Sequence, residues 1–297
     1  MIGKCKTLIV VLNEKHTYFI EYKLKRRCKM TGSNDFRVTT SKMVWIFVLS
    51  CLLGVSSATA QKKWHFGIGT GIMRLNVQGD QGFNAGQFGP VETEVDLDPD
   101  DVSDLMESAI GLGGYATNGT WMVQASFSKI KLGGQPGGTL PSGATVTSDV
   151  SFEVTTGQLT VGHTVYRSGS VTVQPYVGAR YLKHEVGADL TIVGQDTTDV
   201  SRGFDNNWTD VLLGTSLNVA LSKKIGWSTS FDAGFGGSNG TYKVATGISW
   251  RIWKFLALRP NAFYMAIDFE NGERGDADWY LYNANEFGWG LSALINF

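Results

Sequence analysis

The sequence predicts an all-β fold, an up-and-down antiparallel barrel of about ten strands, with eight or twelve as alternatives. Three observations lead to this prediction. Apolar side chains recur at every second position over many segments, which is the period of a β-strand. Tight turns alternate with long polar connections between these segments. Within each segment one face carries large apolar residues, and the other carries mostly Gly, Ser, Thr, Ala and Asn.

Ten segments follow this pattern, separated by turn signals. The tight turns are Asn118-Gly119, Ser168-Gly169, Ser222-Lys224 and Trp253-Lys254, and the long connections are 78–105, 133–148, 193–207 and 270–278. Turns at one end and long loops at the other are typical of membrane barrels. The predicted strands are 62–77, 106–117, 120–132, 149–167, 170–192, 208–221, 225–236, 240–252, 255–269 and 279–297.

The residue types on the two faces distinguish a membrane barrel from a soluble sandwich or lipocalin-like barrel. A soluble exterior would carry many Lys and Glu, whereas small polar residues suit a crowded, wet lumen. Aromatic residues near strand ends fit the girdles found at membrane interfaces, namely Trp227, Tyr242, Trp250 and Trp289. The sequence therefore predicts a transmembrane β-barrel in the outer membrane of a Gram-negative bacterium.

The last strand, FGWGLSALINF, has a continuous apolar face that runs to its final residue. This face would meet lipid, and it is similar to the closing-strand signal that the outer-membrane insertion machinery recognises. The residues assigned to this insertion signal are Trp289, Leu291, Ile295 and Phe297.

The first 60 residues differ from the rest. Residues 1–42 carry ten Lys/Arg against three acidic residues, and are predicted to be an upstream extension outside the mature protein. Residues 43–60 carry no charge and end in Ala58-Thr59-Ala60, which is typical of a cleaved signal peptide. An anchoring helix is the alternative. Translation from Met1, Met30 or Met43 stays open.

The barrel itself is assigned to residues 61–297. All three cysteines lie before residue 61, so this region has neither disulfides nor thiol chemistry.

Residues 61–297 resemble a family of largely uncharacterised bacterial outer-membrane β-barrel proteins. The resemblance rests on Trp208-Thr209-Asp210, on the hairpin Asp232–Ser238, on Ile267–Glu270 and on the last strand. The glycine-rich hairpin is one or two residues shorter than is usual in the family. The resemblance implies a fold and a location, and no chemistry.

A polar network is predicted inside the barrel. If the hairpin 225–252 turns at 237–238, Asp232 and Lys243 lie opposite each other on neighbouring strands. Mixed charges favour a lumen largely filled by side chains, since about ten strands enclose a narrow space. The other residues expected to point inward are Arg180, Asp210, Arg251 and Glu286.

The acidic stretch 91–108 admits two interpretations. Asp96, Asp98 and Asp100 have the spacing of calcium ligands, but Asp101 stands where a calcium loop needs Gly, and Pro99 intervenes. A short helix with Asp98 as its N-cap and Pro99 at its first position is preferred. No metal, cofactor or nucleic-acid site is predicted, because phosphate loops, paired Cys or His ligands and a basic face are missing after residue 60.

Three functions remain in view. The first is a structural or surface-interaction barrel without enzymatic activity, whose expected partners are outer-membrane lipid, lipopolysaccharide and the barrel-insertion machinery. The second is a narrow passive channel for small solutes. The third is a protease-like rim hydrolase that uses His184 together with nearby aspartates. The sequence specifies no extracellular ligand and no oligomeric state.

Overall fold

A computed structural model describes residues 63–84, 89–134, 137–139, 145–193 and 197–297. The predicted upstream extension and signal peptide lie outside these residues. The strands are β1 (His65–Asn84), β2 (Pro90–Leu97), β3 (Met106–Thr117), β4 (Trp121–Gly134), β5 (Gly137–Thr139), β6 (Thr145–His163), β7 (Tyr166–Ser168), β8 (Val171–Val193), β9 (Thr197–Ala220), β10 (Ile225–Phe235), β11 (Gly240–Arg251), β12 (Leu256–Asn271) and β13 (Tyr280–Asn296). The helix α2 spans Pro99–Leu105. Among the described residues, no helix is both long and apolar enough to cross a membrane.

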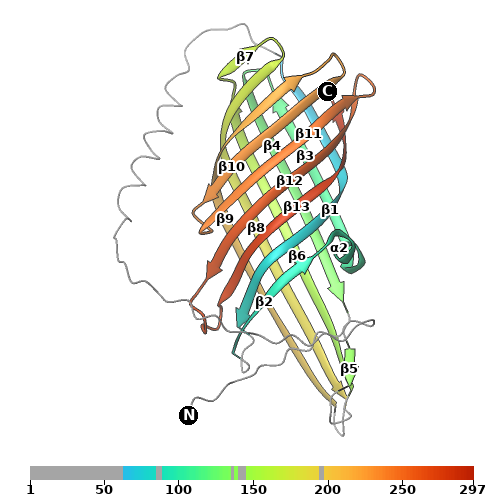
Figure 1. Ribbon diagram of the computed structural model, residues 1–297, viewed down its shortest axis with the longest axis vertical. Coiled ribbons are helices and arrows are strands. Elements are labelled where there is room, and N and C mark those ends of the chain that lie inside the picture. Colours follow the sequence, from blue (N-terminus) through green and yellow to red (C-terminus); the bar gives the residue numbers. More distant parts are fainter. Residues whose placement is uncertain (1–62, 85–88, 135–136, 140–144, 194–196) are drawn as a thin grey trace, which may run out of the picture. The chain divides into compact units, whose positions relative to one another are not determined.

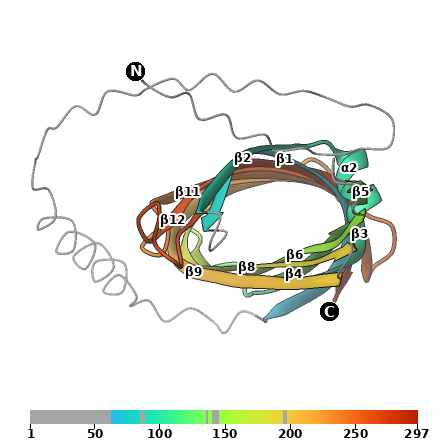
Figure 2. The ribbon, with the colours of Figure 1, turned by 90° about the horizontal axis from the view of Figure 1, so that it is seen from below.

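The strands form one antiparallel sheet that closes on itself (Figures 1 and 2). Its order is β6-β4-β3-β1-β13-β12-β11-β10-β9-β8, and pairing of β8 with β6 completes the ring. The predicted ten-stranded barrel is therefore confirmed. The short strands β2, β5 and β7 are not members of this ring. They pair with β1, β6 and β8, respectively.

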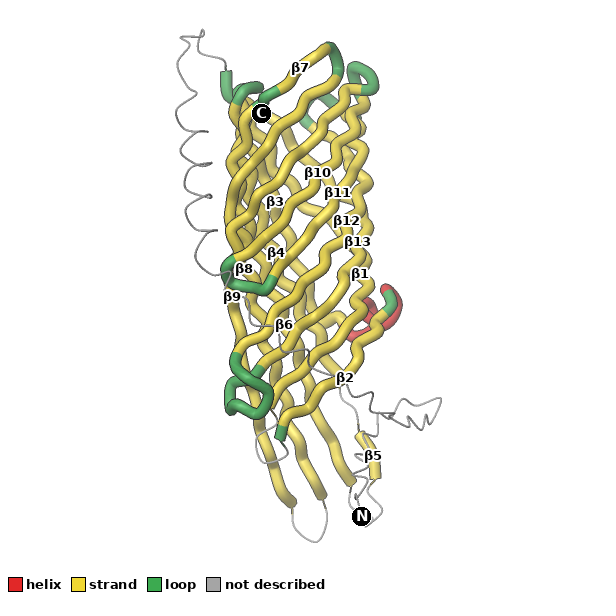
Figure 3. Tube along the Cα trace, turned by 60° about the vertical axis from the view of Figure 1, so that its left-hand side comes forward, coloured by secondary structure: helices red, strands yellow, loops and turns green. Residues whose placement is uncertain are grey.

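The two ends of the barrel differ. We call the end that carries the turns Asn118–Thr120 and Ser222–Lys224, together with Phe297, the turn end; it lies at the top of Figure 1. At the opposite loop end, β6, β8 and β9 extend furthest (Figure 3). The segment 193–207 was predicted to be a loop, and for its described residues, 193 and 197–207, this was wrong. The backbone ladder between β8 and β9 runs out to Val193 and Thr197, beyond the rest of the wall.

The outward face is apolar on nearly every strand. Large side chains that are at least about two-fifths exposed include Phe66, Ile68, Ile72, Ile110, Leu112, Phe127, Leu159, Val177, Val211, Phe231, Val244, Ile248, Tyr264 and Phe287. The insertion-signal residues Trp289, Leu291, Ile295 and Phe297 lie on the same surface. Two backbone hydrogen bonds between Phe66 and Phe297 seal the last strand against the first.

The pairing of β1 changes partner part of the way along the wall. β3 pairs with β1 from His65 to Gly69, and β2 takes its place from Val77 onward. Thr70–Asn76 have no β-ladder partner on this side among the described residues, because α2 interrupts the returning chain. Side chains bridge part of the gap: the Thr70 hydroxyl donates to the Gly111 carbonyl over 2.6 Å, and the Asn76 amide donates to the Leu97 carbonyl over 3.0 Å.

The helix α2 begins as the sequence predicts, with Asp98 at the N-cap and Pro99 at the first position. The Asp98 carboxylate accepts from the backbone amides of Asp101 and Asp100, at 2.9 and 2.7 Å. The Asp101 carboxylate accepts in return from the Asp98 amide, which completes a capping box. The rest of the predicted loop 78–105 is largely strand, since β1 and β2 form a hairpin there.

These hydrogen bonds give the cap a defined pH dependence. Bonds from the Asp101 and Asp100 amides lower the pKa of Asp98 below its usual value of 3.8. Because the pKa is lower in the folded state, the cap stabilises the helix above pH 3.8 and is lost as the pH falls through the folded pKa. We expect a carbon-detected NMR titration of the Asp98 carboxyl group to give a midpoint below 3.8, and a midpoint above it would contradict the cap. Asp98→Asn should keep the N-cap and abolish the titration.

Candidate functional site

The interior of the barrel is filled toward the loop end by an aromatic cluster. The indole of Trp208 stacks on Phe269, with ring centroids 3.9 Å apart and planes 11° apart. His184 lies edge-on to Trp208, Tyr280 and Tyr282. We call these five residues, His184, Trp208, Phe269, Tyr280 and Tyr282, the aromatic plug; each is buried, with at most 5% of its surface exposed.

A buried ion pair lies deeper in the barrel. Arg180 Nη2 is 2.7 Å from Asp232 Oδ1, and the two side chains are 0% and 4% exposed. The Tyr176 hydroxyl donates to the other Asp232 oxygen over 2.9 Å, and Arg180 also donates to Gln158 Oε1. These contacts satisfy most of the polar atoms that burial removes from water.

Lys243 lies directly opposite Asp232 in the β10–β11 register. Its ammonium group is 5.0 Å from the centre of the Phe263 ring, in a cation–π contact. Glu286 stands on β13, level with Lys243 across Met265, and its carboxylate accepts from the Tyr282 hydroxyl over 2.9 Å. We call Arg180, Asp232, Lys243 and Glu286 the polar layer; Glu286 connects this layer to the aromatic plug.

Asp210 has a different role from the one expected, although it is the register partner of Arg180. Its carboxylate accepts from the backbone amides of Gly237 and Ser238, at 3.1 and 2.8 Å, and from the hydroxyls of Ser238 and Thr241. It thereby fixes the turn between β10 and β11. Arg251 lies apart from this group as well, at the turn end. The structure thus separates the predicted network into a central group, a turn anchor and a rim residue.

Three of the four sequence motifs that carry the family resemblance, all except the last strand, come together around this turn. Trp208 stacks on Phe269 of the Ile267–Glu270 motif, and Asp210 holds the Gly237-Ser238 turn. Asn239 donates through its backbone amide and its side chain to Asp268, at 2.9 and 3.2 Å. These motifs have a structural explanation: they join β9, the β10–β11 hairpin and β12.

Toward the turn end the interior is hollow. A cavity of about 800 Å³, which we call the chamber, lies between the ion pair and the turn end. Asp232 and Lys243 line it at its inner end. Its other polar lining includes Gln124, Ser126, Gln158, Asn218, Ser249 and Asn261.

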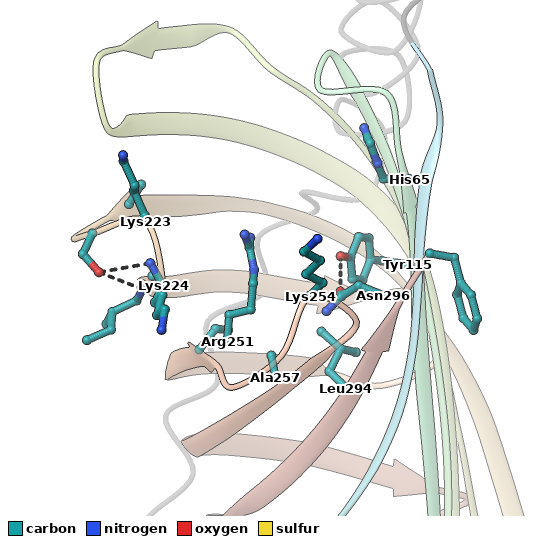
Figure 4. A pocket seen from close by; sticks show the side chains of 15 residues that line it. His65, Tyr115, Lys223, Lys224, Arg251, Lys254, Ala257, Leu294 and Asn296 are labelled. Atoms are coloured by element: carbon teal, nitrogen blue, oxygen red, sulfur yellow. Dashed lines mark hydrogen bonds between the residues drawn. The ribbon is translucent and has the colours of Figure 1, made fainter.

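A second cavity, of about 640 Å³, forms the opening of the barrel at the turn end; we call it the mouth (Figure 4). Lys223, Lys224, Arg251 and Lys254 line it, together with His65. The Tyr115 hydroxyl donates to Asn296 Oδ1 over 2.7 Å at its wall. Tyr115, Ala220, Gly226, Ser249 and Leu294 line both cavities, so the mouth continues into the chamber.

Sequence reasoning missed Tyr176, Gln158 and the aromatic plug. The alternation on β8 carried a signal for Tyr176, since it shares a face with Arg180 and His184. The stack of Trp208 on Phe269 joins β9 to β12, and strand periodicity does not specify contacts across the lumen. Among the described residues, no group of three or more His, Cys, Asp or Glu is placed to hold a metal ion.

No family model matches this sequence, and no curated protein matches it. Similar solved structures include the outer membrane protease OmpT from Escherichia coli, at 7% identity and a TM-score of 0.47, covering 81% of this chain and 97% of that one. The translocator domain of the autotransporter NalP from Neisseria meningitidis matches at 10% identity and a TM-score of 0.42, covering 85% and 94%. Ail, the attachment invasion locus protein of Yersinia pestis, crystallised with a heparin analogue, matches at 10% identity and a TM-score of 0.32, covering 79% and 99%.

Proposed function

We propose that this chain spans the bacterial outer membrane as a barrel that is closed along its axis and acts at the cell surface. The observation that carries this proposal is the filled interior. Arg180, His184 and Tyr280 are each 0% exposed within the barrel. A solute moving along the axis would have to displace the aromatic plug and break the buried Arg180–Asp232 pair.

The outer surface supports the membrane location. Lipid requires an apolar exterior and a closed sheet, and both are present. On β4, Phe127 faces outward, and the next outward positions are Lys129 and Lys131, which pair with Glu153 and Glu107. The charged residues mark the boundary of the apolar band. Outer-membrane lipid, lipopolysaccharide on the outer leaflet and the insertion machinery are the partners that this arrangement suits.

The surface role is supported by the strands that project at the loop end. β8 and β9 pair as far as Val193 and Thr197, beyond the level at which the β10–β11 hairpin turns. Their hairpin presents outward-facing charged side chains, with Lys183 held between Glu185 and Asp205. This projecting β8–β9 hairpin can contact a ligand or a neighbouring surface without any solute passing through the barrel.

A narrow channel is the second candidate, and the chamber of about 800 Å³ with its open mouth is what favours it. A hydrolase has less support from the geometry. His184 Nδ1 is 2.8 Å from the Tyr280 hydroxyl, and Nε2 has no hydrogen-bond partner among the described residues. A general base at the rim needs access to water and substrate, whereas this imidazole is buried among aromatic rings.

Liposome swelling tests the closed axis. Vesicles that contain the unaltered protein should not swell in small neutral sugars. The double variant Trp208→Ala/Tyr280→Ala removes two large rings of the plug but leaves the Arg180–Asp232 pair, so it should admit these sugars only when it is combined with Arg180→Ala/Asp232→Ala. Phe231→Ala is the matched control, because this ring faces outward. Swelling with the unaltered protein would contradict the proposal, and a heat-dependent gel shift confirms that each variant is folded.

A further inference from the structure

The chamber and the mouth have an unequal distribution of charge. Their described lining contains Lys223, Lys224, Lys243, Arg251, Lys254 and Arg259, with His65 at the mouth. Asp232 is the one carboxylate side chain among the same lining residues, and Arg180 already pairs with it. A cavity with low-dielectric walls and one sign of charge concentrates ions of the opposite sign.

The cations of the mouth are available to a ligand. None of Lys223, Lys224, Arg251 and Lys254 takes part in an ion pair within the described part of the chain. Figure 4 shows them around one opening: Lys223 and Lys224 lie in the β9–β10 turn, Arg251 ends β11, and Lys254 lies in the β11–β12 connection. By contrast, Lys129 and Lys131 on the outer wall are paired with Glu153 and Glu107.

Arg259 provides a cation farther inside. Its Nη2 donates to the Ser228 hydroxyl over 2.7 Å, which fixes the guanidinium against the chamber wall. Its Nε is buried against Gly247 and out of reach of a ligand, so only the end of the guanidinium can contact a molecule in the chamber. A Cβ added at Gly247 would stand 2.6 Å from that nitrogen, so the glycine leaves room for the guanidinium. A guanidinium held in place at a cavity wall by one hydrogen bond suits a phosphate or carboxylate.

We propose that the chamber binds a small phosphate- or carboxylate-bearing molecule that enters through the mouth, with Arg251 and Lys254 at the entrance and Arg259 as the inner contact. The direction of entry rests on the proposed closed axis, because the aromatic plug leaves the mouth as the way in. In the outer membrane this mouth would face the periplasm. The volume of about 800 Å³ lies within the usual range of small-molecule sites.

Two sources could supply this anionic group. One is a free solute of the periplasm, which would reach Arg259. The other is the headgroup of a phospholipid in the inner leaflet, which would meet Arg251 and Lys254 at the rim. Variants of the inner and outer cations separate the two sources, since the headgroup of a lipid that stays in the leaflet does not depend on Arg259.

The experiment is isothermal titration of the full-length purified protein, in non-ionic detergent at low salt, with inorganic pyrophosphate. Saturable binding is expected, and Arg259→Gln should weaken it about tenfold or more, as expected for loss of a charged hydrogen bond. Arg259→Lys should retain part of it. Lys129→Gln is the matched control, since it removes a cation that faces outward. Raising the salt concentration should weaken binding further.

A parallel arm measures retention of phosphatidylglycerol after reconstitution in mixed-lipid nanodiscs. Retention that falls with Arg251→Gln/Lys254→Gln, without any pyrophosphate binding, would assign the rim to a lipid headgroup and overturn the proposed site in the chamber. Binding in neither arm, or binding that every cation variant leaves unchanged, overturns it. Binding in detergent does not depend on whether the barrel conducts. A barrel that conducts and still binds pyrophosphate would therefore contradict the proposed closed axis and leave the proposed binding site intact.

Discussion

Replacing Arg180 with Met is expected to destabilise the barrel by about 3–5 kcal/mol, because it leaves a buried carboxylate without its counter-charge. Asp232 is 2% exposed, and Tyr176 would remain its hydrogen-bond donor. One neutral hydroxyl cannot replace a guanidinium. The measurement is equilibrium urea unfolding in detergent micelles, followed by tryptophan fluorescence.

The double variant Arg180→Met/Asp232→Leu should lose less stability than Arg180→Met, since no unpaired charge stays buried. Lys183→Met is the control on the same strand, because its ion pairs with Glu185 and Asp205 are exposed and should contribute little. Equal losses in the single and the double variant would show that Asp232 does not need Arg180.

Asp210→Ala is expected to cost about 3 kcal/mol, since it removes a buried carboxylate that accepts several hydrogen bonds. Gly237 and Ser238 would lose the acceptor for their amides, and hydrogen exchange at these two positions should accelerate more than at the β8–β9 ladder. Asp210→Asn should fall between the native protein and the alanine variant, because one carbonyl oxygen can still accept.

Asp268→Ala is the control for the same turn, because Asp268 is exposed and its carboxylate accepts a hydrogen bond from the Asn239 side chain. Both alanine variants are compared by urea unfolding in detergent micelles and by hydrogen exchange at Gly237 and Ser238. If the two alanine variants lose equal stability, the buried carboxylate is not the anchor of the β10–β11 turn.

The sequence predicts the strands well because a period of two depends on local geometry alone. The position of the β10–β11 turn is also marked locally by Gly236, Gly237 and Ser238, and it is enough to place Asp232 opposite Lys243 in the observed register. The length of β9 was underestimated, because Thr197–Asn207 lack a clear apolar face. Beyond the apolar band of the barrel, β9 is extended by its pairing with β8, and the alternation of apolar residues has less influence on where the strand ends.

Contacts across the lumen could not be derived in the same way. Periodicity tells which face a side chain takes, but the height of that side chain depends on the stagger of all ten strands. Arg180 therefore pairs with Asp232, two strands away, and not with its own register partner Asp210. Arg251 shares the inward parity with Lys243 but lies at the turn end, too far along β11 to join the ion pair.

Single-channel recording in a planar bilayer tests the closed axis most directly. The purified protein, inserted and shown to be folded by its gel shift, is predicted to pass no steady current, because the aromatic plug and the Arg180–Asp232 pair fill the interior. A steady conductance that changes on Asp232→Ala or Lys243→Ala would contradict this account and establish a channel through the polar layer.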